Sequence, residues 1–244
     1  MEVSVSNKEN KGLDEFLVNE ANFDLQRIRN GAILLFDKPE HWSSFKLVKK
    51  VKYFTKAARV GHAGTLDPLA TGLLIIATGK CTKMIESIQA LEKEYTGVFN
   101  FGKTTPSIDL ETEFNGEYPY EHITNADIDE AVLKNTGDVV QTPPVYSAIK
   151  VDGTRAYKKA RAGEEIVIKS RVIQIRHFEV DKNLPKMRFK VNCSKGTYIR
   201  TLTHDFAHQL KSGAYLNELR RTAIGQFRIE NALQIDKFQE LCGK

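Results

Sequence analysis

Runs of apolar residues divide the chain from residue 31 onward into short strands and amphipathic helices. Continuous apolar runs at residues 33–36 and 72–78 predict buried strands, because each run is short and is followed by turn-forming residues. Alternation of apolar and polar side chains predicts further strands, at residues 95–101, 171–180 and 186–192. Residues 1–30 show no sustained pattern, and we expect an N-terminal extension there, a flexible arm with one short helix.

Apolar residues spaced three and four apart predict helices between these strands. Ser43 or Ser44 can cap a helix that places Leu47, Val51 and Phe54 on one face. Further helices are expected at residues 82–91, 124–135 and 199–210, with a helix-like stretch near 154–161. Because the elements follow no regular strand–helix–strand rhythm, the pattern favours an α+β fold over a doubly wound one. We expect residues 31–244 to form one domain, with an insertion at about 142–170.

Composition is that of an ordinary globular protein, with 41% apolar and 27% charged residues. The three cysteines have no CxxC or Cys/His spacing, so we expect free thiols in a reducing compartment. No apolar run is long enough to cross a membrane, and there is no secretion signal, so the expected location is cytoplasmic. His204 and His208 stand four residues apart but lack the glutamate of the HExxH motif, and no metal site is expected.

The net charge of +5 is unevenly distributed along the chain. Residues 1–30 carry a charge of −2, whereas residues 150–171 carry +4 and residues 182–221 carry +7. Two basic segments predict a polyanionic partner such as a nucleic acid. A solvated lysine-rich face would give the same pattern, so charge alone leaves both interpretations open.

The most unusual segment is the loop at residues 59–72, with three glycines and one proline. Glycines let the backbone turn sharply and let a ligand approach closely, and Pro68 keeps the preceding Asp67 out of the helical region. The loop therefore predicts one carboxylate held in a fixed position, with an ordinary Asp-Pro turn as the alternative. It contains neither the phosphate-binding glycine–lysine motif nor the GxGxxG dinucleotide motif.

The loop sequence GHAGTLDPLATG, at residues 61–72, resembles the catalytic loop of the TruB pseudouridine synthases. Other segments resemble motifs of that family in the same order: LLFDKP at 34–39, KEY at 93–95, PVYSAIK at 144–150, CSKGTYIRTL at 193–202 and LRR at 219–221. The resemblance covers roughly residues 31–227. It implies the pseudouridine synthase fold, a mixed and mainly antiparallel sheet with flanking helices and a basic insertion that grips RNA.

The resemblance also implies roles for particular residues. Asp67 would be the catalytic carboxylate, Tyr95 would stack on the target base and serve to remove a proton, and Arg200 would pair with Asp67. Four further residues would contact the RNA or shape the substrate pocket, namely His62, Tyr198, Leu219 and Lys38. Without the resemblance, these residues have common structural roles, as core aromatics, surface ion pairs or loop residues.

The reaction implied by the resemblance is the isomerisation of a uridine, at position 55 in the T-arm loop of tRNA, to pseudouridine. The base must leave the RNA stack, at a cost that stacking on tyrosine rings offsets. No atoms are exchanged with another molecule, so the expected enzyme needs neither a cofactor nor a metal. One carboxylate must attack or deprotonate the ribose, or stabilise its developing cation, and the residues leave the choice open.

Two other function classes share part of this pattern. A non-catalytic RNA-binding module would use the same basic segments and aromatic residues, but it would not require Asp67, Tyr95 and Arg200 together. A sugar hydrolase would need two facing carboxylates, and the motifs offer one. About seventeen residues follow Phe227, which predicts the short, stand-alone bacterial type, without a C-terminal RNA-binding domain, guide RNA or obligate protein partner.

Overall fold

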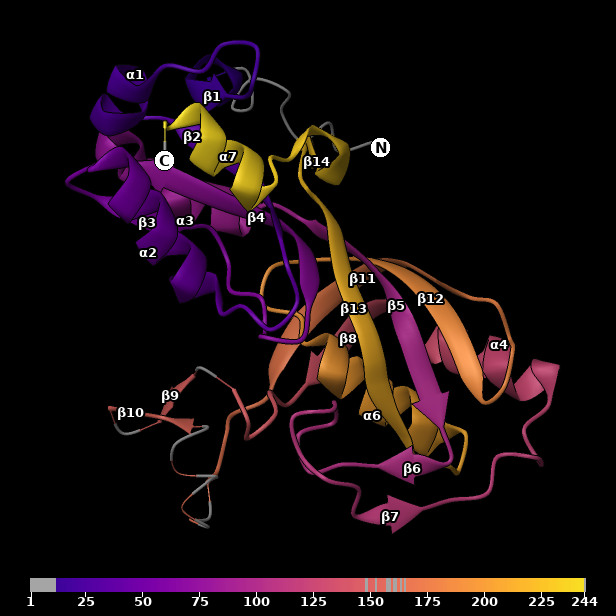
Figure 1. Cartoon of the computed structure of the whole chain (residues 1–244). Helices are drawn as coiled ribbons and strands as arrows, with labels where there is room; N and C mark the ends of the chain where they lie inside the picture. Colours follow the sequence, from indigo (N-terminus) through magenta and orange to yellow (C-terminus); the bar gives the residue numbers. More distant parts are fainter. Residues whose placement is uncertain are drawn as a thin grey trace. The chain divides into compact units, whose positions relative to one another are not determined.

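The computed structural model describes residues 12–147, 149–151, 153–156, 159, 162, 164 and 166–243. The chain divides into two compact units. Unit 1 contains Met1–Lys93 and Arg220–Lys244, and unit 2 contains Glu94–Leu219. The long strand β13 (Ala214–Ile224) contributes residues to both units (Figure 1).

Unit 1 is centred on two antiparallel strands, β2 (Ile33–Lys38) and β4 (Thr71–Thr78). Parallel neighbours flank them, because β1 (Leu17–Val18) pairs with β2, and β13 pairs with β4. The remaining elements of unit 1 are η1 (Asp14–Phe16), α1 (Leu25–Asn30), α2 (Ser44–Thr55), β3 (Val60–His62), η2 (Gly79–Met84), α3 (Ile85–Ala90), β14 (Phe227–Arg228), η3 (Ile229–Asn231) and α7 (Ile235–Leu241).

Both faces of β2 and β4 are buried, which explains their continuous apolar sequences. Leu34 and Phe36 point into a core cluster formed with α1, α2 and α7. Ile33 and Leu35 belong to a second cluster, which includes Ile88 of α3. Successive side chains of a strand point to opposite faces, so a strand covered on both sides has no polar face to show in its sequence.

Unit 2 contains a sheet in the order β13, β5, β12, β11, β8 and a core of phenylalanine rings. The rings of Phe99 and Phe189 stack with centroids 4.2 Å apart, and Phe206 of α6 packs against Phe99. The elements of unit 2 are β5 (Lys93–Phe101), β6 (Lys103–Thr104), β7 (Gly116–Glu117), α4 (Asn125–Lys134), β8 (Gly137–Gln141), β9 (Lys150–Val151), β10 (Thr154–Arg155), β11 (Arg171–Val180), β12 (Lys186–Cys193) and α6 (Ile199–Gln209).

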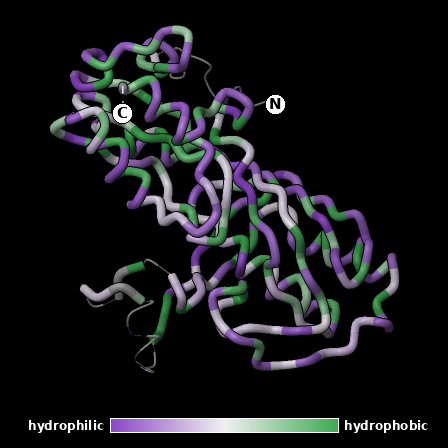
Figure 2. Tube along the Cα trace, in the orientation of Figure 1, coloured by the Kyte–Doolittle hydropathy of each residue, from purple (hydrophilic) through white to green (hydrophobic). Residues whose placement is uncertain are grey.

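The observed elements confirm the α+β fold with a mixed, mainly antiparallel sheet. The predicted strands at 33–36 and 72–78 are present, and so is the amphipathic helix α2, whose first turn is capped by the side chain of Ser43. Figure 2 shows the apolar and polar residues that alternate around this helix. Thr124 likewise caps α4, where its side chain and that of Asp127 form a capping box.

Two of the predicted helical segments differ in part from the structure. The expected helix at 82–91 begins as the 3₁₀ helix η2, where Thr82 Oγ1 donates to the carbonyl of Gly79 and competes with the α-helical pattern. In the expected helix-like stretch, Thr154–Arg155 is instead strand β10, paired with β9, whereas Ala156 and Lys159 are helical as predicted. Other positions of that stretch lie outside the described residues, namely Tyr157, Lys158, Ala160 and Arg161.

The interpretation of residues 1–30 as a flexible arm does not hold for the part that the structure describes. Residues 12–30 include β1 and the expected short helix, α1. The side chains of Val18 and Ile28 are buried in the core of unit 1. Residues 1–11 lie outside the described part of the chain.

Two further observations bear on the class of protein. The side chains of Cys81, Cys193 and Cys242 are buried, and none of the three forms a disulfide. Within the described residues, every helix is too short or too polar to cross a membrane.

Candidate active site

Asp67 lies in the loop between β3 and β4 of unit 1, and its side chain is partly exposed. The residue before it, Leu66, is held by the first residue of α2. The hydroxyl of Ser44 accepts a hydrogen bond from the Leu66 amide at 2.9 Å and donates one to the Leu66 carbonyl at 3.0 Å. Both residues are buried, so a single hydroxyl satisfies two backbone groups that water does not reach.

The residue after Asp67 is held by Lys38, the last residue of β2. The Lys38 side chain is fully buried, and its ammonium donates to the carbonyls of Pro39, Trp42 and Pro68 at 2.9, 2.7 and 3.2 Å. Burial lowers the pKa of Lys38 to about 8, while the negative charges of Asp67 and Glu40 oppose the shift. At neutral pH the group is therefore still an ammonium, with three donors for three carbonyls.

The ends of the loop are held by Arg221, which is 1% exposed. Its guanidinium donates to the carbonyl of Leu73 at 2.8 Å and to that of Gly64 at 3.1 Å. Gly72 lies against the Arg221 backbone, and a Cβ atom at this position would come within 2.3 Å of the Arg221 carbonyl oxygen. A glycine is therefore required there, both for this close approach and for its φ of +100°.

His62, at the end of β3, is a further predicted site residue in unit 1. Burial lowers its pKa, and the positive charge of Arg221 acts in the same direction. The imidazole is therefore neutral at physiological pH, and any contact that it makes with RNA uses hydrogen bonding or stacking in place of charge.

Unit 2 carries the two predicted tyrosines. Tyr95 lies on β5 and is 8% exposed. Tyr198 precedes α6, and the side chain of Gln141 bonds to both its amide and its carbonyl, at 3.0 and 3.1 Å. The guanidinium of Arg171 lies 5.1 Å from the centroid of the Tyr198 ring. The backbone of Tyr198 is thus fixed, while its partly exposed ring is in contact with a cation.

Arg200, in the first turn of α6, is 4% exposed and holds three segments of unit 2 together. Its guanidinium donates to the carbonyl of Ser107 at 3.1 Å and to that of Tyr146 at 2.9 Å. Its Nε atom lies 3.6 Å from a carboxylate oxygen of Asp109, which is buried as well. Arg200 therefore links the helix to the loop at Ser107 and to Tyr146, in the segment that follows β8.

The seven predicted residues divide between the units. Asp67, Lys38 and His62 belong to unit 1, where Lys38 is tied to the loop that carries Asp67. Tyr95, Tyr198, Arg200 and Leu219 belong to unit 2, and Leu219 lies on β13. The pairing of Arg200 with Asp67 stays a prediction, because the two residues belong to different units.

Three residues that support the site were not recognised from the sequence. The sequence marks Ser44 only as a candidate helix cap and Arg221 only as part of a matched segment, and it gives Asp109 no role. Their partners lie 22 to 157 residues away along the chain, at Leu66, Arg200 and Gly64. Arg221 stands between Arg220 and Thr222, so its local sequence gives no sign that its side chain is buried.

Among the described residues, the structure contains no group of three or more His, Cys, Asp and Glu side chains close enough to hold a metal. His204 and His208 stack with ring centroids 6.1 Å apart, and His204 Nδ1 lies 3.0 Å from the carboxylate of its neighbour Asp205.

Comparison with known proteins identifies relatives over most of the chain. Residues 52–199 match the family model described as TruB family pseudouridylate synthase (N terminal domain). A protein of Flavobacterium johnsoniae named tRNA pseudouridine synthase B is 52% identical over 218 residues, which are 86% of this chain and 95% of the relative. One of the same name from Phocaeicola vulgatus is 48% identical, over 87% of this chain and 93% of the relative.

A solved structure described as a Cbf5-Nop10-Gar1 complex contains a chain of similar fold. The TM-score is 0.68 at 24% sequence identity, and the match covers 93% of this chain and 59% of the other. The present chain thus spans less than two thirds of that protein, and at this identity the similarity concerns the fold alone.

Proposed function

Because the chain belongs to the TruB family of pseudouridylate synthases, we propose that it converts a uridine in the T-arm loop of tRNA, at position 55, to pseudouridine, with Asp67 as the catalytic carboxylate. Family membership makes the chain an isomerase, a pseudouridine synthase. The name tRNA pseudouridine synthase B, borne by relatives about half identical to this chain, supports tRNA as the substrate.

The observation that carries the assignment of Asp67 is the way its loop is held. The backbone on one side of Asp67 is bound by Ser44 and on the other side by Lys38, and both side chains are buried. Asp67 itself remains partly exposed. A carboxylate on a restrained backbone, with its own side chain accessible, is suited to act on a bound sugar, because little motion has to be frozen when the substrate arrives.

The proposed reaction is balanced within one molecule of RNA. The bond between ribose C1′ and uracil N1 breaks, the base turns, and a bond forms between C1′ and C5. The proton on C5 is lost and N1 gains one, so no co-reactant is consumed. Asp67 would attack or deprotonate the ribose, or stabilise the cation that develops on it.

The other predicted residues would serve the flipped base. Tyr95 would stack on it and take the proton from C5, with the ring of Tyr198 and the side chain of Leu219 against the same pocket. Arg200 would pair with Asp67 and keep it ionised. Near the Asp67 loop, His62 would contact the RNA at the place that the flipped base has left. Lys38 would shape the floor of the substrate pocket.

We further propose that the protein acts without a guide RNA or an obligate protein partner, in the cytoplasm where tRNA is found. Residues 31–244 would act as one catalytic domain, with residues 1–30 as an extension. The basic insertion at about 142–170 would grip the RNA. The sequence of this insertion supplies cations and the aromatic Tyr157, the residue types that bind phosphates and bases.

The test is direct mapping of the product. The purified chain is incubated with an unmodified tRNA transcript, and pseudouridine is located nucleotide by nucleotide. We expect it at position 55 and nowhere else. In parallel, tritium release from C5-labelled uridine should be abolished by Asp67→Asn, while RNA binding stays nearly unchanged.

The matched control is Glu86→Gln, which neutralises an exposed carboxylate of the same unit, in the first turn of α3. It should leave tritium release at the wild-type level. Pseudouridine at another position would overturn the T-arm assignment, and substantial turnover by Asp67→Asn would remove Asp67 as the essential group.

A further inference from the structure

Helix α2 carries a concentration of positive charge that the two basic segments of the sequence do not include. Between Glu40 and Asp67 the chain has no Asp or Glu. The same stretch contains five lysines and one arginine, namely Lys46, Lys49, Lys50, Lys52, Lys56 and Arg59. All five lysines lie on α2 or at Lys56, its C-terminal cap.

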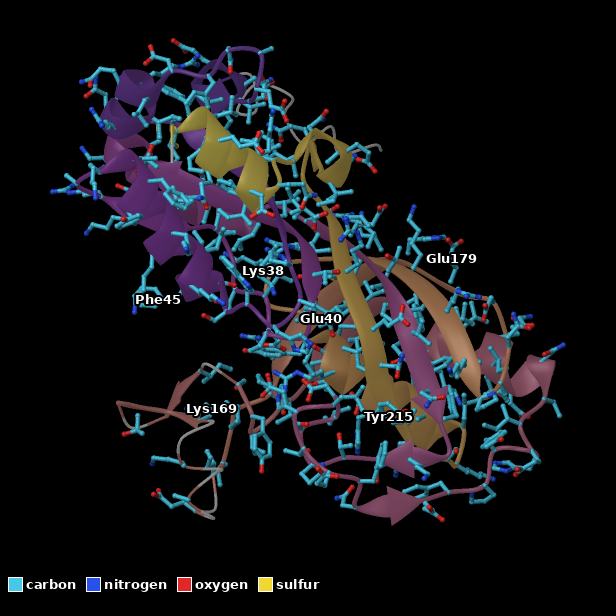
Figure 3. All side chains as sticks on the ribbon, viewed as in Figure 1. Lys38, Glu40, Phe45, Lys169, Glu179 and Tyr215 are labelled. Atoms are coloured by element: carbon cyan, nitrogen blue, oxygen red, sulfur yellow. The ribbon has the colours of Figure 1, made fainter. Side chains whose placement is uncertain are left out.

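These lysines share an exposed face with two aromatic residues. Phe45, Lys49, Lys52 and Lys56 are spaced three and four apart, and therefore form one row along the helix. Lys46, Lys50 and Tyr53 form the adjacent row. Phe45 is 60% exposed and Tyr53 61% exposed, and Figure 3 shows Phe45 pointing away from the helix. We call these seven residues the lysine–aromatic face.

Each exposed ring of this face lies under a lysine ammonium. The Nζ atom of Lys49 lies 4.9 Å from the centroid of Phe45, and that of Lys56 lies 4.3 Å from the centroid of Tyr53. Cation–π contacts at exposed sites contribute only about 0.5–1 kcal/mol. Incoming phosphates can therefore draw the ammonium groups away, which leaves the rings free to stack on bases.

The opposite face of α2 is already occupied. Leu47, Val51 and Phe54 are at most 4% exposed and belong to the core of unit 1. A basic amphipathic helix that binds membranes inserts its apolar face into the lipid, and here that face is not available. The exposed side offers cations and flat rings, which match a nucleic acid better than a lipid surface.

The position of the face links it to the reaction. Ser44, the first residue of α2, is hydrogen-bonded to Leu66, the neighbour of Asp67. From Phe45 to Lys56 the helix rises about 16 Å, at 1.5 Å per residue. The lysine–aromatic face thus starts beside the loop of the proposed catalytic carboxylate and extends away from it.

We propose that the lysine–aromatic face of α2 binds the ribose–phosphate backbone of the RNA substrate, in the stretch that leaves the Asp67 loop. The lysines neutralise phosphates, and the rings of Phe45 and Tyr53 stack on unpaired bases or pack on riboses. The inference rests on the proposed function, since it requires that the substrate be RNA. The lysine–aromatic face would be a second RNA-binding surface, in unit 1, beside the one proposed for the basic insertion of unit 2.

The test is a charge reversal, Lys49→Glu with Lys52→Glu, in the full chain. Each phosphate contact contributes about 0.7 to the slope of log affinity against log salt on single strands, and about 0.9 on a duplex. The double variant should therefore bind a tRNA transcript with a slope reduced by about 1.4–1.8. Its single-turnover rate at saturating RNA should equal that of the wild type. Phe45→Ala with Tyr53→Ala should weaken binding without changing the slope.

The matched control is Lys83→Glu with Lys237→Glu, which makes the same charge change at exposed positions elsewhere in unit 1. Equal slopes for the α2 variant, the control and the wild type would overturn the proposal, and so would equal reductions in both variants. Vesicles of equimolar phosphatidylglycerol and phosphatidylcholine test the other polyanionic surface. Vesicle binding that depends on Lys49 and Lys52, with an unchanged RNA slope, would assign the face to a membrane.

The experiments distinguish a failure of the proposed function from a failure of the α2 role. If the wild type neither binds nor modifies tRNA, the proposed function fails. If the wild type modifies tRNA and the α2 variant keeps its slope, the proposed function stands and only the role of α2 is lost.

Discussion

The hydroxyl of Ser44 binds both the amide and the carbonyl of Leu66, the residue that precedes Asp67. Ser44 opens α2 but does not cap it, because its neighbour Ser43 accepts the capping bond from the Lys46 amide at 3.1 Å. Two adjacent serines thus divide two tasks. One stabilises the end of a helix, and the other fixes the backbone of the candidate catalytic loop.

This division predicts different effects for two similar variants. Ser44→Ala leaves two buried backbone groups of Leu66 unpaired, at about 1–3 kcal/mol for each. It should also let Asp67 move, and a displacement of about 1 Å can slow a reaction roughly 100-fold. Ser43→Ala should cost about 0.5–2 kcal/mol as the loss of a helix cap, with unchanged turnover. Urea unfolding and single-turnover kinetics measure both quantities, and equal turnover in the two variants would contradict the role of Ser44.

Lys38 should make stability depend on pH above about 8. Its pKa is about 8 in the folded chain, against 10.5 as the ordinary value. Between these values the unfolded chain binds more protons than the folded one, so the free energy of unfolding should rise with pH. Lys38→Met lacks this group. The stability difference between wild type and Lys38→Met, measured by urea unfolding at about pH 7.5 and about pH 9.5, should therefore shift in favour of the wild type.

Turnover should change in the opposite direction. Above about pH 8 the neutral amine of Lys38 has two N–H donors for three carbonyls, so the bond to Pro68, the longest of the three at 3.2 Å, is the first to be lost. The loop that carries Asp67 then loosens while the protein as a whole does not. Single-turnover rates of the wild type should fall as the pH is raised from neutral to about 9. Lys38→Arg is the reference, because its guanidinium stays charged over this pH range. If the wild-type rate changes with pH no more than that of Lys38→Arg, the hydrogen bond from Lys38 to Pro68 does not matter for the reaction.

Gly72→Ala should be far more damaging than its backbone angle alone requires. The new Cβ would lie 2.3 Å from the Arg221 carbonyl oxygen, so β4 and β13 must separate. Gly137 is the matched control, because it has a similar positive φ, +92°, and a Cβ added there would meet no atom within 4 Å. Gly137→Ala should cost about 1 kcal/mol or slightly more, and Gly72→Ala several times as much. Thermal unfolding of both variants decides the matter, and equal losses would rule out the steric explanation.

Arg200→Lys should destabilise unit 2 and stop turnover. A lysine ammonium is a point charge and does not span the carbonyls of Ser107 and Tyr146 and the carboxylate of Asp109. Each buried carbonyl that loses its donor costs about 1–3 kcal/mol. Asp109→Asn, which keeps the shape but removes the charge, should have a smaller effect in the same direction. Near-wild-type melting and kinetics for Arg200→Lys would contradict the structural role.

Local sequence patterns predict those helices and strands that are determined by residues close together in the chain. The caps at Ser43 and Thr124 and the buried runs of β2 and β4 are of this kind. Strand β13 was not predicted, because Leu216 and Leu219 are separated by Asn217 and Glu218 without regular alternation. Its pairing with β4 joins positions that are far apart in the sequence, such as Arg220 and Thr71, and no local pattern encodes that.

The candidate site was predictable to a similar extent. The loop of Asp67 stands out through its glycines and Pro68, and the family resemblance supplied its chemistry. The side chains that hold it did not stand out. A serine and an arginine are ordinary residues in a sequence, and the importance of Ser44 and Arg221 lies in the carbonyls and amides that they reach across the fold.

The division of unit 1 into two stretches of sequence has a consequence for synthesis on the ribosome. All residues of unit 2 have been added once Leu219 is joined, whereas the Asp67 loop has only Ser44 and Lys38 to hold it until Arg221 follows, 157 residues after Gly64. Phe238, in the core beneath α2, comes later still. For most of translation, the apolar strands β2 and β4 are therefore already synthesised but lack their later partners, β13 and α7. Unit 2 can fold first, and the candidate active site is among the last parts to be assembled.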